Sequence, residues 1–314
     1  ATVAVAQQGA QQRYVGLQLL NLNAEPDYGA DIIEQSVGAG ANLVVLTIYW
    51  DEVYKTATSQ PDWRQPDLQM EQIARLGIKA GIRIMLGRKA ERLQGFWTPN
   101  EIMNDDLGRP LWGVYGRTCF SFAHAPTVTK AQSFLKEVCQ RYNAYQSQGN
   151  ILYVTFVNTP TQELGYHYET ELNGDYKQVY PTGFDYSSPS LEAFKGWITQ
   201  QYKRINKLNY IWGTKFTSLN DVRPPTTAYR PLPAYRTRAG KDWYLFSHLQ
   251  LKNFIDQSIR TIKQVNPSYK VVNEYGAVID VQAAVRGTIA FKNLDENADG
   301  TKVHNDLYWN HRFI

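Results

Sequence analysis

A group of carboxylate, amide and phenol side chains follows the apolar segment 151–157. Asn158, Gln162, Glu163 and Tyr166 come soon after the end of this segment. A glutamate in such surroundings can transfer a proton as a general acid or base, or can attack an electrophilic carbon as a nucleophile. Glu163 is therefore the first candidate for a catalytic residue. The alternative interpretation of Glu163 is a solvated loop carboxylate.

The segment that positions this group is typical of a buried strand. Its sequence, ILYVTFV, mixes β-branched and aromatic residues, as strands of a parallel sheet covered by helices do. Side chains just beyond the C-terminal ends of such strands converge on the active site of a (β/α)8 TIM barrel. We predict strands at 14–20, 43–48, 82–86, 151–157, 270–275 and 303–309, and helices at 27–38, 66–80, 126–146, 191–205 and 242–265. This alternation indicates parallel βα architecture.

The predicted barrel has six visible βα units, whereas closure requires eight strands. A six-stranded parallel sheet leaves two unpaired edges. Segments 93–125 and 217–240 could supply the missing strands, or a second chain or a homo-oligomer could complete the barrel. We favour an incomplete barrel, with long loops at 93–125 and 170–189 over its C-terminal face.

The length of the chain and its N-terminal sequence indicate how many domains to expect. The 314 residues suit a single barrel domain at 14–314 that follows an N-terminal arm at 1–13. The arm contains Ala-Val-Ala followed by glutamines, which resembles the end of a secretory signal peptide. No segment approaches the roughly 20 apolar residues of a membrane-spanning helix. We therefore expect a secreted or periplasmic protein.

Several other functional classes find little support in the sequence. The 33 lysines and arginines are scattered, so nucleic acid is not an expected partner. The sequence contains no glycine-rich phosphate loop, and its five histidines lack ligand spacing, so no cofactor or catalytic metal is expected. Asp295, Asn297 and Asp299 follow the alternation that opens a calcium loop. The same residues also favour a tight polar turn, and calcium is the weaker of the two interpretations.

Three stretches of the chain carry a family resemblance. They are QELGYH at 162–167, SLEAFKGWITQQYKRINKLNYIWGTKF at 190–216 and KDWYLFSHLQLKNFIDQSIRTIKQVNP at 241–267. Together they resemble the family 42 glycoside hydrolases, which are β-galactosidase-like barrels. The resemblance implies retaining hydrolysis of glycosides, with an acid/base after the fourth strand and a nucleophile after the seventh. Glu163 matches the acid/base, Gln162 stands where the family has Asn, and 159–161 is an insertion.

Glu274, in the sequence VVNEYG, is the candidate for the second carboxylate because it lies at the end of the fifth predicted strand. Retaining cleavage requires about 5–5.5 Å between the two carboxyl groups. Glu163 and Glu274 can therefore cooperate only if their strands are adjacent. The competing carboxylates at other strand ends are Asp51, Glu52, Glu91 and Asp306. The alternative for each competitor is an ion pair at the rim.

A carbohydrate is the expected substrate. Aromatic rings can stack on sugar rings, although they are also ordinary core residues. The candidate substrate-binding residues are Trp50, Asp51, Arg88, Trp97, Asn158, Gln162, Tyr166, Asn305, Asp306 and Trp309. Arg88 could face an acidic sugar or form an ion pair at the rim.

These observations lead to two hypotheses of different classes. The first is a secreted glycoside hydrolase in which Glu163 donates the proton. The second is a barrel that binds carbohydrate without a working carboxylate pair, or one part of a split glycosidase. The insertion at 159–161 and the position of the nucleophile motivate the second hypothesis.

Overall fold

The structure is a computed structural model of the chain. It describes residues 13–20, 27–93, 95–111, 116–166, 169–172, 175–178, 184–226, 237–276, 283 and 286–303. Side chains are described for these residues except 90, 169–172 and 175–178.

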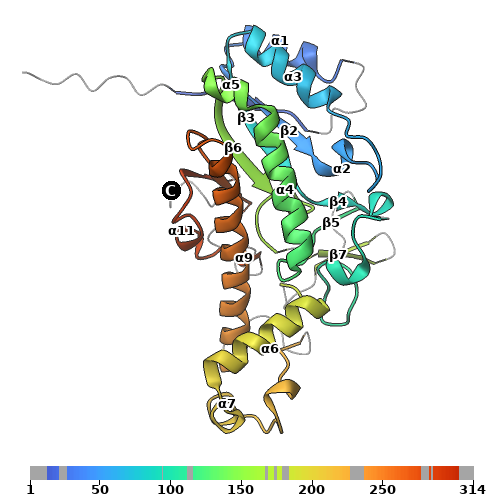
Figure 1. Ribbon diagram of the computed structural model, residues 1–314, viewed down its shortest axis with the longest axis vertical. Coiled ribbons are helices and arrows are strands. Elements are labelled where there is room, and N and C mark those ends of the chain that lie inside the picture. Colours follow the sequence, from blue (N-terminus) through green and yellow to red (C-terminus); the bar gives the residue numbers. More distant parts are fainter. Residues whose placement is uncertain are drawn as a thin grey trace, which may run out of the picture.

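A parallel sheet forms the centre of the molecule (Figure 1). Its strands are β1 (Gly16–Gln18), β2 (Leu43–Tyr49), β3 (Lys79–Met85), β6 (Ile151–Val157), β9 (Val272–Tyr275) and β10 (Gly300–Val303). The first four pair in this order, and β9 pairs with β10. A parallel bridge between Val154 and Val271 joins β6 to the segment that enters β9. Within the described residues, six parallel strands therefore follow one another in sequence order, which confirms the predicted α/β class.

The described helices either pack against one face of this sheet or extend beyond it (Figure 1). They are α1 (Ala30–Gly38), α2 (Trp50–Val53), α3 (Arg64–Arg75), α4 (Ala125–Arg141), α5 (Asn143–Ser147), α6 (Ser188–Tyr202), α7 (Ile205–Trp212), α9 (Arg238–Val265) and α11 (Phe291–Leu294). The long helices α4 and α9 run side by side, and α6 and α7 lie against α9 at one end of the molecule (Figure 1). Among the helices described, none has the length and apolar character needed to cross a membrane.

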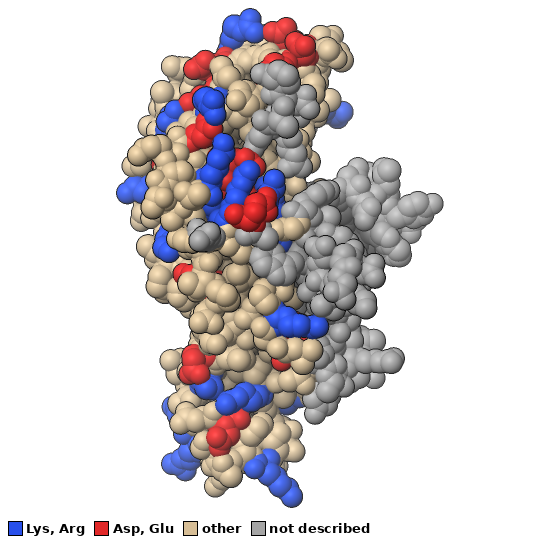
Figure 2. All heavy atoms as spheres, turned by 90° about the vertical axis from the view of Figure 1, so that its right-hand side faces the viewer, with Lys and Arg blue, Asp and Glu red and all other residues tan. Residues whose placement is uncertain are grey.

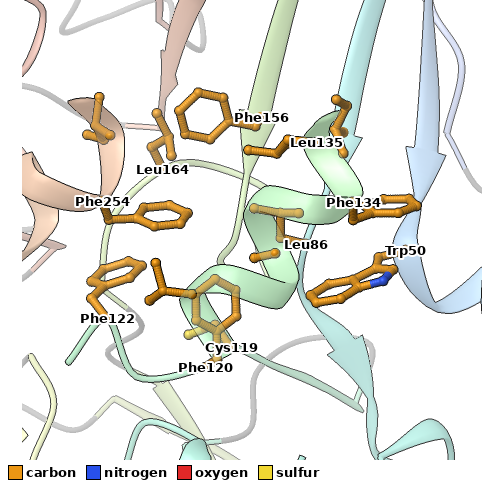
Figure 3. Packing of buried hydrophobic residues seen from close by; sticks show 14 of the residues in the cluster. Trp50, Leu86, Cys119, Phe120, Phe122, Phe134, Leu135, Phe156, Leu164 and Phe254 are labelled. Carbon is orange, nitrogen blue, oxygen red and sulfur yellow. The ribbon is translucent and has the colours of Figure 1, made fainter. Parts of the chain in front are cut away.

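The sheet face that meets the helices is apolar, because alternate residues of a strand point to the same side. Val44 and Ile48 of β2 are buried there. Figure 3 shows Phe156 of β6 close to Leu135 of α4 and Phe254 of α9. Burial of each such side chain contributes roughly 1.5–3 kcal/mol. This outer core is therefore the main source of stability.

The inner face of the sheet is largely polar. The strand register places Thr47, Arg83 and Thr155 in one layer, and Tyr49, Met85 and Val157 in the next layer toward the C-terminal ends. The second layer forms a small apolar cluster separate from the outer core. An ordinary TIM barrel fills this space with bulky branched residues. The buried arginine in the first layer therefore marks the interior as a place where charges gather.

The two outermost strands approach each other through side chains. Lys302 of β10 donates to Gln18 of β1 across 2.5 Å. Within the described residues, β1 and β10 do not pair through their backbones. The sheet is therefore curled like a barrel wall, but it is not closed.

Several predicted boundaries were wrong. The strand predicted at 82–86 begins at Lys79, and the helix predicted at 126–146 is interrupted between α4 and α5. The helix predicted at 66–80 ends as α3 at Arg75, because Gly77 adopts a φ of +69° that ends a helix. The last described strand, β10, occupies Gly300–Val303, so the strand predicted at 303–309 begins earlier than expected. Residues 304–309 lie outside the described residues.

In their described part, the irregular segments form short antiparallel strand pairs instead of barrel strands. The antiparallel pairs are β4 (Arg88–Lys89) with β5 (Arg117–Thr118), and β7 (Glu169–Leu172) with β8 (Asp175–Gln178). Among the described residues, neither pair joins the central sheet. The suggestion that 93–125 could contribute a barrel strand is therefore not supported by its described part.

Candidate active site

A tight turn after β6 positions Glu163. The backbone oxygen of Glu163 accepts hydrogen bonds from the N–H groups of Asn158 and Thr159, at 3.1 and 3.0 Å. Gln162 adopts a φ of +70° within this turn, a conformation that is uncommon for residues other than glycine. The inserted residues 159–161 thus close a hydrogen-bonded loop. They return Glu163 to the end of the strand instead of displacing it.

Glu163 is almost completely enclosed, with 6% of its surface exposed. Its carboxylate accepts a hydrogen bond from Arg286 Nη1 at 2.7 Å and from Thr159 Oγ1 at 3.2 Å. The glutamate lies close to Gly276, where an added Cβ would come within 3.0 Å of Glu163 Cδ. Gly276 is therefore required for this close approach. The guanidinium of Arg286 thus forms an ion pair with this carboxylate.

Glu274 lies on the strand next to Glu163. Strand β9 adjoins β6 through the bridge at Val154 and Val271, and Leu164 N donates to the backbone oxygen of Glu274 at 2.8 Å. The adjacency required for the two carboxylates to cooperate is therefore present. Glu274 itself is fully buried at 0% exposure. Its carboxylate contacts Arg83 Nε and Lys302 Nζ, each at 3.0 Å.

Arg83 contacts both Glu274 and the turn that carries Glu163, and the sequence interpretation missed this arginine. Beyond its contact with Glu274, it donates from Nη1 to Gln162 Oε1 at 2.8 Å and from Nη2 to the Gln162 backbone oxygen. Gln162 precedes Glu163 in the turn, so Arg83 ties that turn to β9. A single arginine within the otherwise apolar core of KAGIRIM was the available signal, because such a residue is almost never fully buried unless it is paired.

Together these residues form what we call the carboxylate network: Arg83, Gln162, Glu163, Glu274, Arg286 and Lys302. Burial lowers the pKa of Lys302 below its usual range, and the Glu274 carboxylate opposes that shift. The network holds two carboxylates against three cationic side chains, so each carboxylate has a partner that stabilises its charge. An ionised carboxylate can act as a nucleophile or a general base, and it must take up a proton before it can act as an acid.

Four predicted substrate-binding residues have structural roles instead. Trp50 and Trp97 are buried, at 3% and 4% exposure, and Trp50 stacks on Phe134 in the outer core. The side chain of Asn158 donates from Nδ2 to the backbone oxygen of Gly165 and accepts from the Gly165 N–H through Oδ1. Tyr166 donates to Ser247 O at 2.8 Å, and burial raises its pKa well above the usual value. These side chains are engaged by the protein because they lie between the sheet and its covering elements.

Asp51 and Arg88 are likewise held within the rim. Asp51 is buried and accepts from Arg117 Nη1 at 2.8 Å and from Lys89 N at 3.0 Å. Arg88 is buried over the ring of Phe96 and donates to Tyr54 O at 2.7 Å. The interpretation of these residues as rim ion pairs therefore fits Asp51, whereas Arg88 is held by the backbone carbonyls of Tyr54 and Arg92 and by an aromatic ring.

The remaining predicted residues fall into two groups. Asn305, Asp306 and Trp309 lie outside the described residues. The calcium candidates are engaged by different protein groups: Asp295 accepts from Tyr275, Asn297 donates to Asp256, and Asp299 pairs with Lys263. In the part of the chain that is described, no group of three or more His, Cys, Asp or Glu side chains is arranged to hold a metal ion. The turn interpretation of this segment is the one that fits.

Comparison with known proteins finds similarity to glycoside hydrolases. Residues 158–306 match the model of glycoside hydrolase family 42, described as Beta-galactosidase. β-Galactosidase BglY of Alicyclobacillus acidocaldarius is 31% identical over 87 residues, which are 27% of this chain and 12% of that protein. The β-amylase of Cytobacillus firmus is 34% identical over 64 residues, which are 19% of this chain and 14% of that protein.

Solved structures give the same fold. The catalytic domain of β-amylase from Paenibacillus polymyxa superposes with a TM-score of 0.73 at 15% identity, covering 92% of this chain and 76% of that one. The β-galactosidase of Marinomonas ef1 gives 0.67 at 14% identity, covering 93% of this chain and 40% of that one. The chain therefore has the fold of these TIM-barrel proteins, with a sheet that is not closed within the described residues, and it is distantly similar to family 42 over residues 158–306, as expected. It spans only a fraction of the length of these β-galactosidases.

Proposed function

We propose that this protein is a glycoside hydrolase that cleaves O-glycosidic bonds with two carboxylates, Glu163 and Glu274. The observation that carries the proposal is the carboxylate network, in which Glu163, in the turn after β6, lies beside Glu274 on the adjacent strand β9. The relatives found by comparison are glycoside hydrolases, and they support the same class. The chain would accordingly act on a carbohydrate.

Each carboxylate has a distinct role in this proposal. Glu274, held ionised by Arg83 and Lys302, attacks the anomeric carbon as the nucleophile. Glu163 is the more exposed of the two, and it protonates the leaving oxygen after taking up a proton. It then returns to the ionised form that Arg286 stabilises and deprotonates the attacking water. This sequence is the retaining mechanism.

The identity of the sugar is also a proposal, which we base on the comparisons. The family model is described as Beta-galactosidase, so a β-galactoside is the first substrate to test. The structural likeness to a β-amylase makes an α-glucan the second. Secretion or a periplasmic location remains our proposal from the N-terminal sequence, and fractionation of the native host would test it. Completion of the barrel by a second polypeptide would be tested by the mass of the purified protein in solution.

The test compares hydrolysis of a panel of aryl glycosides by the wild-type chain, Glu163→Gln and Glu274→Gln. Loss of a catalytic acid or nucleophile should lower kcat by at least about 100-fold. Glu192→Gln is the matched control, because Glu192 is 70% exposed on α6 and pairs only with Lys195 among its described contacts. Equal activity of Glu163→Gln and wild type would remove Glu163 from the mechanism. The anomer formed first, followed by NMR, would separate retention from inversion.

A second function has one observation in its favour. Glu274 is fully buried and paired with two cations, as expected of a structural ion pair in a barrel that binds carbohydrate without cleaving it. A fluorinated aryl glycoside that traps a glycosyl-enzyme, located on Glu274 by mass spectrometry, would exclude this alternative. Calorimetric binding of sugars without turnover would favour it.

A further inference from the structure

A hollow lies on the C-terminal side of β2, outside the carboxylate network. It encloses about 380 Å³, within the range of roughly 300–1,000 Å³ typical of small-molecule sites. Its charged lining residues are Glu52, Lys55, Asp62, Arg64, Lys89 and Arg92. Figure 2 shows the face that carries α2 and β4, where basic and acidic side chains gather in one patch. We call this hollow the rim pocket.

The rim pocket carries an excess of positive charge. Its lining includes four cations and two carboxylates, a difference of two positive charges. Arg64 and Arg92 are close to Asp62 and Glu52, each at 2.6 Å. Lys55 and Lys89 are farther from the same two carboxylates, at 3.7 and 3.8 Å. Each carboxylate is thus shared between two cations, and the two ammonium groups keep capacity for an additional anion.

The charge excess continues behind the pocket. Arg88 and Arg117 are both buried there, and Asp51 pairs with Arg117. Burial lowers the pKa of Arg88 to about 10; Asp51 opposes this shift, whereas the neighbouring Arg92 and Arg117 add to it. A low-dielectric wall behind a group of cations strengthens the field at the opening of the pocket. An anionic group would therefore be attracted to this opening.

The rim pocket adjoins the carboxylate network through Tyr49. This residue lines the pocket, and its hydroxyl donates to Gln162 Oε1 at 3.4 Å. Gln162 immediately precedes Glu163 and is held by Arg83. The pocket and Glu163 are thus neighbours along the C-terminal ends of the strands, where TIM-barrel enzymes bind their substrates.

We propose that the rim pocket binds the anionic group of an acidic sugar, so that the site prefers negatively charged glycans to neutral ones. The inference rests on the proposed function of the carboxylate network, which would act on the adjoining glycosidic bond. Lys55 and Lys89 supply the charge that is not fully matched, while Arg64 and Arg92 offer planar groups suited to an anion. The shared ligand chemistry is a sugar carboxylate or a sugar sulfate.

Calorimetry on the full chain carrying Glu163→Gln tests the proposal without turnover. The ligands are galacturonate, galactose 6-sulfate and galactose. We expect at least one charged sugar to bind about tenfold more tightly than galactose, a factor that corresponds to roughly 1.4 kcal/mol. This preference should weaken with added salt, because exposed charges are screened. It should disappear in Lys55→Gln/Lys89→Gln, and Lys207→Gln on α7 is the control that should retain it.

The outcomes separate this inference from the proposed function. A gain for both charged sugars supports recognition of charge, and a gain for galacturonate alone supports recognition of the planar carboxylate. No gain for either, or a gain that survives the double lysine substitution, overturns the inference. If neutral glycosides are hydrolysed without any preference for charge, only the inference fails. If charged sugars bind but no glycoside is cleaved, only the proposed function fails.

Discussion

Arg83→Met should be one of the most damaging single substitutions to stability in this chain. The substitution preserves most of the apolar stem but removes the guanidinium that contacts Glu274 and Gln162. Breaking a buried ion pair from one side costs about 3–5 kcal/mol, because a buried charge loses its partner. Lys302 remains 3.0 Å from Glu274, so we expect a value near the lower end, about 3 kcal/mol.

The chain supplies its own matched control. Arg75 and Glu34 form an ion pair at 2.8 Å, similar in length to the 3.0 Å pair of Arg83 and Glu274, but their side chains are 67% and 51% exposed. Exposed pairs contribute about 0–1 kcal/mol. Arg75→Met should therefore have little effect. Both substitutions remove an arginine from one carboxylate. The contrast therefore compares the loss of a buried arginine that also bonds to Gln162 with the loss of an exposed ion pair.

Urea unfolding followed by tryptophan fluorescence measures the difference. The midpoint should fall in Arg83→Met with little change in the slope. In a double-mutant cycle with Glu274→Gln, the two losses should sum to more than the loss of the double variant, because they share one interaction. The reasoning is refuted if Arg83→Met costs no more than Arg75→Met, or if the losses are additive.

Three further outcomes are expected. Gly276→Ala should reduce kcat/KM strongly and the melting temperature only slightly, because the new Cβ would lie 3.0 Å from Glu163 Cδ and 2.8 Å from Arg286 Nη1. Steady-state kinetics and a thermal melting curve measure the two effects. Unchanged kinetics would contradict the prediction. Burial, then the Glu274 carboxylate, raises the pKa of Tyr153 to about 12, above its unfolded value of about 10. The stabilisation by neutral Tyr153 is therefore complete below pH 10 and is lost as the pH rises toward 12. Between these pH values the urea midpoint of Tyr153→Phe should fall less than that of wild type. Parallel plots of midpoint against pH for the two proteins would refute the assignment. Phe254→Ala should cost about 3–5 kcal/mol by urea unfolding, because the ring is buried against Phe156 in the outer core, and a cost below 1 kcal/mol would show that the core repacks.

The strands were predictable where their residues are apolar on the helix-facing side. The segment 151–157 matches β6 without a shift, because β-branched and aromatic residues fill both of its faces. The prediction for 66–80 overran α3, since Ile78 and Ala80 continue an apolar pattern that Gly77 interrupts with a positive φ. Periodicity identifies which residues are buried, but a single backbone conformation decides where an element ends.

The site was predictable only in part, for a similar reason. Glu163 and Glu274 could be identified as carboxylates at strand ends, and their strands are adjacent. Their partners Arg83, Arg286 and Lys302 are distant in sequence, so only the curled sheet brings them together. Pairing across the interior depends on strand register, which sequence periodicity alone does not fix.

The carboxylate network also bears on why the inner face is polar. Replacing a buried ion pair by well-packed apolar residues is often neutral or stabilising, so Arg83 and Glu274 are not needed for the fold on energetic grounds. The Oγ1 atoms of Thr47 and Thr155, in the same layer as Arg83, have no hydrogen-bond partner among the described residues, and this adds a cost. The apolar contacts of α4 and α9 with the sheet offset that cost on the outer face. The outer face of the sheet is thus apolar, whereas the inner face combines a layer that holds charge with a small apolar cluster. This arrangement accords with a catalytic use of the interior, because perturbed and desolvated charges gather where chemistry is performed.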